Sequence, residues 1–370
     1  MFRKLTDLKD VRGKRVIVRL DLNLPLSNGA PRDTFRITRS LKTLEYLQTG
    51  GARTVLIAHI DEKEGGSLKP VYEYLKKILP VSFSLLDEAP GAVENLAEGT
   101  FVLIENLRTA PGEEANDSEF AKKLAKLGDC FVNEAFSVSH RPHASIVGIP
   151  KLLPSYAGFT FIEEVENLSR AFNAPRPFLF ILGGAKFETK MPLVERFLSL
   201  ADFCFVGGAL ANDFYKAKGY EIGDSRFSDG NFNLDVYMNN PKLSLPVDVV
   251  VLNEKGNVVK RPDEVSVGDK ILDVGPASVT DIVSLIEKSA FVLWNGPFGD
   301  YEKGFREASE RVAKALASSK AVSIVGGGDT LALISKLNLN EKFTFISTGG
   351  GAMLDFLAQG TLPGIEALSG

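Results

Sequence analysis

Polar and cationic side chains directly follow four apolar runs in the first half of the chain. They are Asp21 and Asn23 after the run 15–20, with Arg36 further on, then His59 after 54–58, Asn106 and Arg108 after 101–105, and His140, Arg141 and His143 after 130–133. An arginine guanidinium offers a rigid fork of donors that suits carboxylate and phosphate oxygens. A lone arginine after a strand is more often part of a surface ion pair, and a lone histidine is usually a structural residue. Gathered in a chain of formal net charge −4, they predict a site for a small, multiply charged anion.

The second half carries glycine where its apolar runs end. The segments are LGGAK (182–186), GGAL (207–210), NGPFG (295–299), GGGDT (326–330) and TGGGA (348–352). Glycine lets a backbone approach a ligand closely, and unpaired N–H groups at a following helix start attract anions. One glycine pair is simply a tight strand-to-helix turn, but five such segments favour a bound nucleotide. Asp329 is then placed to hold the Mg²⁺ of its phosphates.

Several other kinds of site are absent from the sequence. No G-x-x-x-x-G-K-[ST], G-x-G-x-x-G or G-x-S-x-G motif occurs, which disfavours a P-loop enzyme, a dinucleotide dehydrogenase and a serine hydrolase. Cys130 and Cys204 lie inside apolar runs and are expected to be buried, reduced thiols. The N-terminus has no apolar signal core, so we expect a cytoplasmic protein without nucleic-acid or membrane partners. An anion site and a nucleotide site together suggest phosphoryl transfer.

The elements that position these residues follow an alternating pattern. Short apolar runs, which are the strand candidates, alternate with helical patterns. The first half has one more such run, 81–85, besides the four named above, and those of the second half are 178–182, 203–206, 248–252, 271–274, 291–294, 322–325 and 343–347. Most are continuously apolar, which is typical of strands buried on both faces of a parallel sheet. The sequence therefore predicts a doubly wound α/β fold. Apolar residues at helical spacing predict an amphipathic connecting helix over 161–173, with one domain on either side.

The motifs also resemble one known family nearly end to end. VRLDLNLPL (18–26), IENLR (104–108), NEAFSVSHRPHAS (133–145), PFLFILGGAKFETK (177–190), LWNGPFGDYE (293–302), GGGDT and STGGGA occur in the order found in phosphoglycerate kinases. The resemblance implies two Rossmann-like domains with a cleft between them, and Mg²⁺-dependent phosphoryl transfer between 1,3-bisphosphoglycerate and ADP. It further implies a phosphoglycerate-binding domain over 1–160, a nucleotide-binding domain over 174–352, a tail 353–370 packed back on the first domain, and a monomer.

The resemblance also assigns roles to individual residues. The phosphoglycerate would be bound by Asp21, Asn23, Arg36, His59, Arg108, His140 and Arg141. Arg36, Lys186, Lys190 and Gly350 would act on the transferring phosphoryl group. ATP or ADP with Mg²⁺ would be bound by Lys190, Gly208, Glu302, Gly327, Gly328, Asp329, Thr330, Gly349 and Gly351, with Asp329 as the acid linked to the metal.

The departures from the family pattern lie in the first half. The family's H-L-G-R-P-x-G loop reads HIDEKEGG here, so Glu62 stands at the arginine position and Lys63 at the proline position. Ser137 replaces a usual glycine, and Glu134 a usual aspartate. A reversed charge beside a phosphate should weaken binding of the acid substrate. The alternative to an active kinase is therefore a nucleotide-binding homologue with a degenerate phosphoglycerate loop; a Rossmann oxidoreductase lacks its glycine fingerprint.

Overall fold

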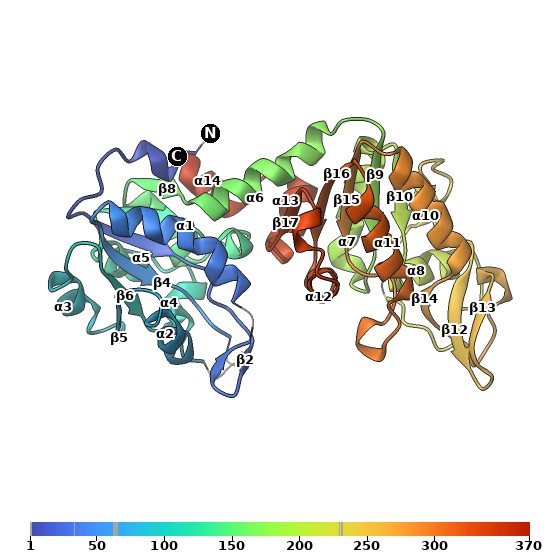
Figure 1. The fold of residues 1–370 in the computed structure, drawn as a ribbon, viewed down its shortest axis with the longest axis horizontal. Helices are drawn as coiled ribbons and strands as arrows, with labels where there is room; N and C mark the ends of the chain where they lie inside the picture. Colours follow the sequence, from blue (N-terminus) through green and yellow to red (C-terminus); the bar gives the residue numbers. More distant parts are fainter. Residues whose placement is uncertain (1, 33, 62–65, 229, 231) are drawn as a thin grey trace. The chain divides into compact units, whose positions relative to one another are not determined.

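The computed structural model describes residues 2–370 except 33, 62–65, 229 and 231. The chain divides into two compact units (Figure 1). Unit 1 comprises residues 1–166 and 359–370, and unit 2 comprises residues 167–358. Helix α6 (Phe159–Ser169) crosses the boundary in sequence. It begins slightly before the helix expected over 161–173, and its continuation, Arg170–Asn173, is a 3₁₀ turn.

Unit 1 is built on a parallel six-stranded sheet with the order β5-β6-β4-β1-β7-β8. The strands are β5 (Val81–Ser84), β6 (Phe101–Ile104), β4 (Arg53–Ile57), β1 (Arg15–Arg19), β7 (Cys130–Asn133) and β8 (Ser155–Ala157). The helices include α1 (Phe35–Thr49), α2 (Lys69–Leu75), α3 (Ala89–Glu94), α4 (Pro111–Glu114), α5 (Ser118–Ala125) and α14 (Pro363–Ser369). The strand order reverses between β1 and β7, and in open α/β sheets ligands bind at the carboxyl ends beside such a point.

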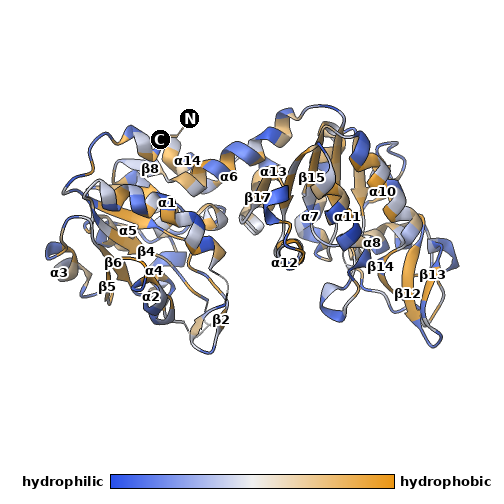
Figure 2. Cartoon of the chain, viewed as in Figure 1, coloured by the Kyte–Doolittle hydropathy of each residue, from blue (hydrophilic) through white to orange (hydrophobic). Residues whose placement is uncertain are grey.

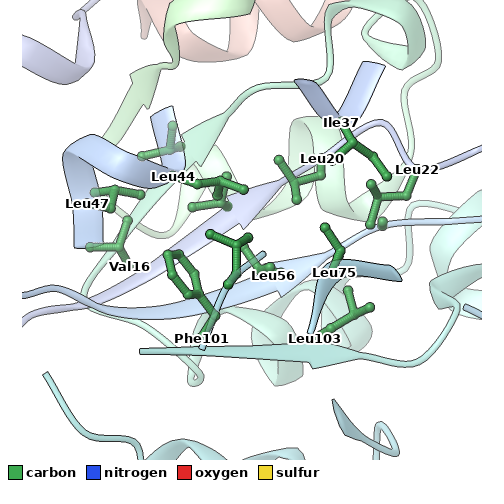
Figure 3. Close-up of a cluster of buried hydrophobic side chains, with 14 of the residues drawn as sticks. Val16, Leu20, Leu22, Ile37, Leu44, Leu47, Leu56, Leu75, Phe101 and Leu103 are labelled. Atoms are coloured by element: carbon green, nitrogen blue, oxygen red, sulfur yellow. The ribbon is translucent and has the colours of Figure 1, made fainter. Parts of the chain in front are cut away.

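The core of unit 1 shows why these segments form a layered fold. Ile37, Leu44 and Leu47 recur at helical spacing on α1 and pack over Val16 and Leu56 of the sheet (Figure 3). Both cysteines, Cys130 of β7 and Cys204 of unit 2, are buried free thiols, and burial raises the pKa of each. Figure 2 shows hydrophobic residues concentrated on the strands, while the helices also carry hydrophilic ones.

The C-terminal segment of the chain belongs to unit 1 from residue 359 onward. The backbone N–H of Gly364, at the start of α14, donates to the carbonyl of Ser139, with an N–O distance of 2.9 Å. A Cβ at Gly364 would lie 2.6 Å from the Cβ of Ser139, so glycine permits this close approach. Residues 353–358, which the sequence analysis placed in the tail, belong to unit 2.

Unit 2 contains a second parallel six-stranded sheet, with the order β11-β10-β9-β15-β16-β17. The strands are β11 (Leu243–Ser244), β10 (Phe203–Val206), β9 (Phe178–Leu182), β15 (Phe291–Asn295), β16 (Val322–Gly326) and β17 (Phe345–Ser347). The main helices are α7 (Phe187–Leu200), α8 (Ala209–Ala217), α10 (Pro276–Lys288), α11 (Glu307–Ser318), α12 (Gly328–Lys336) and α13 (Gly351–Gln359). The predicted α/β fold with parallel sheets is confirmed.

Two of the predicted strands belong to neither parallel sheet. Segments 248–252 and 271–274 form β12 (Val249–Asn253) and β14 (Lys270–Val274) of a small antiparallel sheet ordered β13-β12-β14. Asn253 pairs with Gly256, so the chain reverses over the two residues between them into β13 (Gly256–Lys260). The expectation of buried parallel strands was wrong here because a run of valines hides an alternation of buried and exposed positions. None of the described helices is long and apolar enough to cross a membrane.

Candidate active site

Unit 1 brings Asp21, Asn23 and Arg36 into direct contact at the carboxyl end of β1. Arg36 lies in the first turn of α1, and its Nη1 is 2.9 Å from Asp21 Oδ2. The same guanidinium donates to the carbonyl of Asn23 at 3.1 Å. Ser137, one of the departures from the family pattern, donates its hydroxyl to Asp21 Oδ2. Asp21 is therefore held by a cation and a hydroxyl, and its side chain is only 11% exposed.

Arg108 forms an ion pair with an acidic residue that the sequence analysis did not single out. Asp61 forms an ion pair with Arg108 Nη1, and its Oδ2 accepts from Asn23 Nδ2 at 2.9 Å. The Asp61 backbone N–H in turn donates to Asn23 Oδ1 at 3.1 Å. Glu114 lies on the other side of Arg108, with 3.3 Å between Oε1 and Nε. Arg108 is thus paired with two carboxylates.

A buried arginine, Arg19, contacts the ring of His59. Arg19 is 1% exposed, and its Nη2 lies 3.0 Å from His59 Nδ1. A guanidinium can only donate, so Nδ1 must accept, and the ring proton of a neutral His59 is on Nε2. Burial, followed by the charge of Arg19, lowers the pKa of His59 far below its usual range. His59 therefore stays neutral and presents Nε2–H as a donor.

The buried Arg19 is itself fully engaged. Its Nε donates to Ser145 Oγ at 2.8 Å, its Nη1 to the carbonyl of Leu20 at 2.6 Å, and Ser145 Oγ donates to Glu113 Oε1 at 2.5 Å. Glu113 is fully buried and supplies the counter-charge, 4.0 Å from Nη2. A charged residue at the end of the apolar run RVIVRL was the signal for this network, because arginine is rarely buried without a partner.

The remaining predicted residues of unit 1 follow β7. Arg141 Nε lies 3.4 Å from His140 Nε2, and both side chains are partly buried. The charges of Arg108 and Arg141 both act on His59, which places the ends of β4, β6 and β7 in one cationic cluster. The seven residues that the resemblance assigns to the phosphoglycerate thus all lie at the carboxyl edge of one sheet. Glu62 and Lys63 lie outside the described residues.

In unit 2, the glycines after β9 and β15 make room for Lys190. Lys190, on α7, is 8% exposed and donates from Nζ to the carbonyl of Gly183. A Cβ at Gly184 or at Gly296 would lie 2.6 Å from Nζ. Burial lowers the pKa of Lys190 to about 8, although the charge of Asp329 opposes the shift. These glycines therefore seat a buried ammonium, a role that the sequence analysis did not anticipate.

The three glycines of GGGDT differ in their surroundings and in their backbone conformation. A Cβ at Gly326 would lie 2.1 Å from Met353 Sδ, so this glycine serves packing. Gly327 precedes α12 with φ of 100°, a conformation that favours glycine. Gly328 opens α12 with no atom near its missing Cβ, and Asp329 follows in the first turn. Of the three glycines, Gly328 is therefore the one that faces open space.

Two cavities adjoin these segments. The first, of about 380 Å³, includes Gly208, Glu302 and Asp329 in its lining, and the second, of about 340 Å³, includes Lys186, Lys190, Gly327, Gly328, Asp329 and Gly350. Gly184, Ala185, Arg226, Pro297 and Asp329 line both, so the cavities are adjacent. Thr330, Gly349 and Gly351 are in neither lining, and Thr330 is fully buried. The described residues contain no cluster of three or more histidine, cysteine or acidic side chains suited to a metal.

Comparisons with known proteins agree with this arrangement. The family model for phosphoglycerate kinase matches residues 5–360. The chain belongs to the phosphoglycerate kinase family. A phosphoglycerate kinase from Thermus thermophilus is 41% identical, with full coverage of both chains, and one from Dictyoglomus turgidum is 39% identical, covering 97% of this chain and 96% of the relative.

Solved structures of the phosphoglycerate kinase family show the same fold. The structure of phosphoglycerate kinase from Coxiella burnetii is similar with a TM-score of 0.86 at 36% identity, covering 100% of this chain and 98% of that one. The enzyme from Pyrococcus horikoshii gives a TM-score of 0.85 at 30% identity with the same coverage. Family membership and the α/β fold therefore rest on sequence and structure alike.

Proposed function

We propose that this chain catalyses reversible, Mg²⁺-dependent phosphoryl transfer between 1,3-bisphosphoglycerate and ADP, giving 3-phosphoglycerate and ATP. The observation that carries the proposal is the pair of lysines and Asp329 around one cavity, in a chain of the phosphoglycerate kinase family. In the reverse direction, a carboxylate oxygen of 3-phosphoglycerate attacks the γ-phosphorus as the bond to ADP breaks. The attacking carboxylate is already ionised, so the site needs no general base.

The nucleotide fits the cavities of unit 2. Glu302, in the lining of the 380 Å³ cavity, is suited to the ribose hydroxyls, and Gly327, Gly328 and the start of α12 to the phosphates. Gly208 lines the same cavity. Thr330, Gly349 and Gly351 are not part of its lining, and they would support the residues that contact the nucleotide. Lys186, Lys190 and Gly350 border the adjoining cavity, where the transferring phosphoryl group would lie.

The donor set also fits a magnesium nucleotide. Mg²⁺ usually keeps several waters and is held by one or two carboxylates together with substrate phosphates. Asp329 is an exposed carboxylate that lines both cavities, so it would hold the metal jointly with the phosphates. When bound, the metal neutralises phosphate charge. The charge of Lys190 would act on the transferring group itself.

The acid substrate fits the cluster of unit 1. Arg36, Arg108 and Arg141 supply cationic forks for its phosphate and carboxylate groups, and His140 would assist Arg141. His59 adds a neutral donor, while Asp21 and Asn23 suit its hydroxyl group. The enzyme is proposed to be a cytoplasmic monomer that acts on small molecules only. Size-exclusion chromatography with light scattering tests the proposed oligomeric state.

A coupled assay with 3-phosphoglycerate and MgATP tests the proposal. We expect turnover that depends on both substrates and on Mg²⁺. In the same assay Lys190→Ala should lower turnover, and Lys336→Ala is its matched control, because Lys336 is an exposed lysine in the last turn of α12. No turnover by a folded wild-type protein that still binds MgADP would instead support a degenerate homologue.

A further inference from the structure

One buried amide stands out in the first cavity of unit 2. Asn212, on α8, is 1% exposed yet belongs to the lining of the 380 Å³ cavity. It is absent from the lining of the adjoining cavity, where Lys186 and Lys190 lie. Apolar and aromatic residues are also part of this lining, among them Tyr215, Pro246, Val249 and Leu272. Such a surface suits the flat face of a nucleotide base better than its phosphates.

The orientation of the amide is determined by its one hydrogen bond. Asn212 Nδ2 donates to the backbone carbonyl of Arg226, with an N–O distance of 2.8 Å. A carbonyl can only accept, so the amide nitrogen must face it, and a flipped amide would set oxygen against oxygen. Oδ1 is therefore left as a pure acceptor, and it has no hydrogen-bond partner among the described residues.

A buried acceptor without a partner is costly, and few are found in native structures. Another polar group of the same lining is already satisfied, because the Tyr215 hydroxyl donates to the carbonyl of Pro246 at 2.8 Å. A ligand that brings a hydrogen-bond donor to Asn212 Oδ1 would remove the deficit. Adenine carries such a donor in its exocyclic amino group at position 6, whereas a 6-oxopurine carries an acceptor at that position.

We propose that Asn212 determines base specificity: its Oδ1 accepts a hydrogen bond from the 6-amino group of adenine. This inference rests on the proposed function, which places a nucleotide in this cavity. A 6-oxopurine turns an oxygen toward the same atom, so two acceptors face each other and neither is satisfied. Sites built to pair a ligand N–H discriminate strongly against analogues that lack it.

The experiment is calorimetric titration of the full chain with MgADP and with MgIDP, which differ at position 6 of the base. We expect MgADP to bind roughly 5- to 100-fold more tightly, the range for one satisfied against one unsatisfied buried hydrogen bond. Asn212→Ala and Asn212→Leu should bring the two affinities to within about 3-fold of each other, mainly by weakening MgADP. Leucine matches asparagine in size, so it guards against loss of fold in the alanine variant.

Glu302→Gln is the matched control, because both nucleotides carry the same ribose. It should weaken MgADP and MgIDP by the same factor and leave their ratio unchanged. Equal affinities of the wild-type protein for the two nucleotides would overturn the inference and leave the proposed function intact. So would an unchanged ratio in both Asn212 variants. Failure of the folded wild-type protein to bind either nucleotide at millimolar concentration would overturn the proposed function itself.

Discussion

Replacing Asp61 by asparagine should tighten binding of the acid substrate. In the structure the Asp61 carboxylate pairs with Arg108, a residue proposed to bind 3-phosphoglycerate. The substrate must displace this carboxylate before it can use the arginine. The side chains are 16% and 31% exposed, so the pair is partly buried and worth more than a surface ion pair, about 1–2 kcal/mol. Asparagine keeps the size and an oxygen for Asn23, but removes the charge.

A gain of this size corresponds to a KM for 3-phosphoglycerate that falls roughly 5- to 30-fold, with KM for MgATP unchanged. Steady-state kinetics at two ionic strengths provide the measurement, and added salt should narrow the difference between variant and wild type. Asp129→Asn is the matched control, because Asp129 pairs with Arg15 at 2.6 Å at the opposite, amino-terminal edge of the same sheet. An unchanged or raised KM in Asp61→Asn would refute the idea that this carboxylate competes with the substrate.

The further predictions concern four single side chains. Lys190→Ala should lower kcat on the order of 10²–10³-fold with little change in KM, since its charge acts mainly in the transition state; a raised KM with unchanged kcat contradicts that role. Because the pKa of Lys190 is lowered to about 8, the ligand-free protein loses this charge as pH rises through 8, and kcat/KM should fall there. For His59, ¹⁵N NMR should show a neutral ring that is protonated on Nε2, and the chain has only three histidines to assign. Arg19→Gln should give a mixture of the two tautomers. A mixture already present in the wild-type protein would exclude the assigned geometry. Burial raises the pKa of Glu134 from its ordinary value of 4.5 to about 8. Between these two pH values the folded state keeps a proton that the unfolded state releases, so the stability of the protein falls as pH rises from 4.5 to 8. Glu134→Gln should therefore raise Tm more at pH 8 than at pH 5, and an equal change at both pH values would count against a buried, titrating acid. Glu62→Arg should lower KM for 3-phosphoglycerate roughly 5- to 100-fold by replacing a repulsive charge with a forked donor, and no change would mean that the departure from the family pattern is neutral.

The sequence could predict the two parallel sheets because burial on both faces leaves a continuous apolar run. It could not predict which neighbour each strand pairs with, as the segments 248–252 and 271–274 illustrate. Their valines and isoleucine suit a central parallel strand as well as one strand of an exposed antiparallel hairpin. The two-residue turn before Gly256 was the available signal, but a hairpin is specified by pairing across the turn rather than by composition.

The place of the candidate residues in the fold was predicted, but their mutual contacts were not. Strand ends and glycine segments placed these residues at the carboxyl edge of each unit's sheet, because a parallel sheet gathers its carboxyl ends at one edge. The glycines around Lys190 show the limit of that reasoning, since some of them make room for a buried lysine of the same unit rather than for a ligand. Asp61 was missed for a similar reason. Its significance lies in a contact with Arg108, 47 residues away in sequence, which no local pattern records.

The ion pairs of unit 1 have a consequence for how the acid substrate is recognised. Arg36 pairs with Asp21, and Arg108 with Asp61, so two of the arginines proposed to bind the substrate already have carboxylate partners. The pairing offsets the repulsion among cations gathered at one edge of the sheet, and it holds their guanidinium groups in place. Binding then exchanges one carboxylate for another, and the affinity reflects the difference between two ion pairs rather than the full strength of either. Asp21 also accepts from Ser137, whereas Asp61 has neither a cation besides Arg108 nor a hydroxyl among its described contacts. Asp61 is therefore the carboxylate that a substrate displaces more easily.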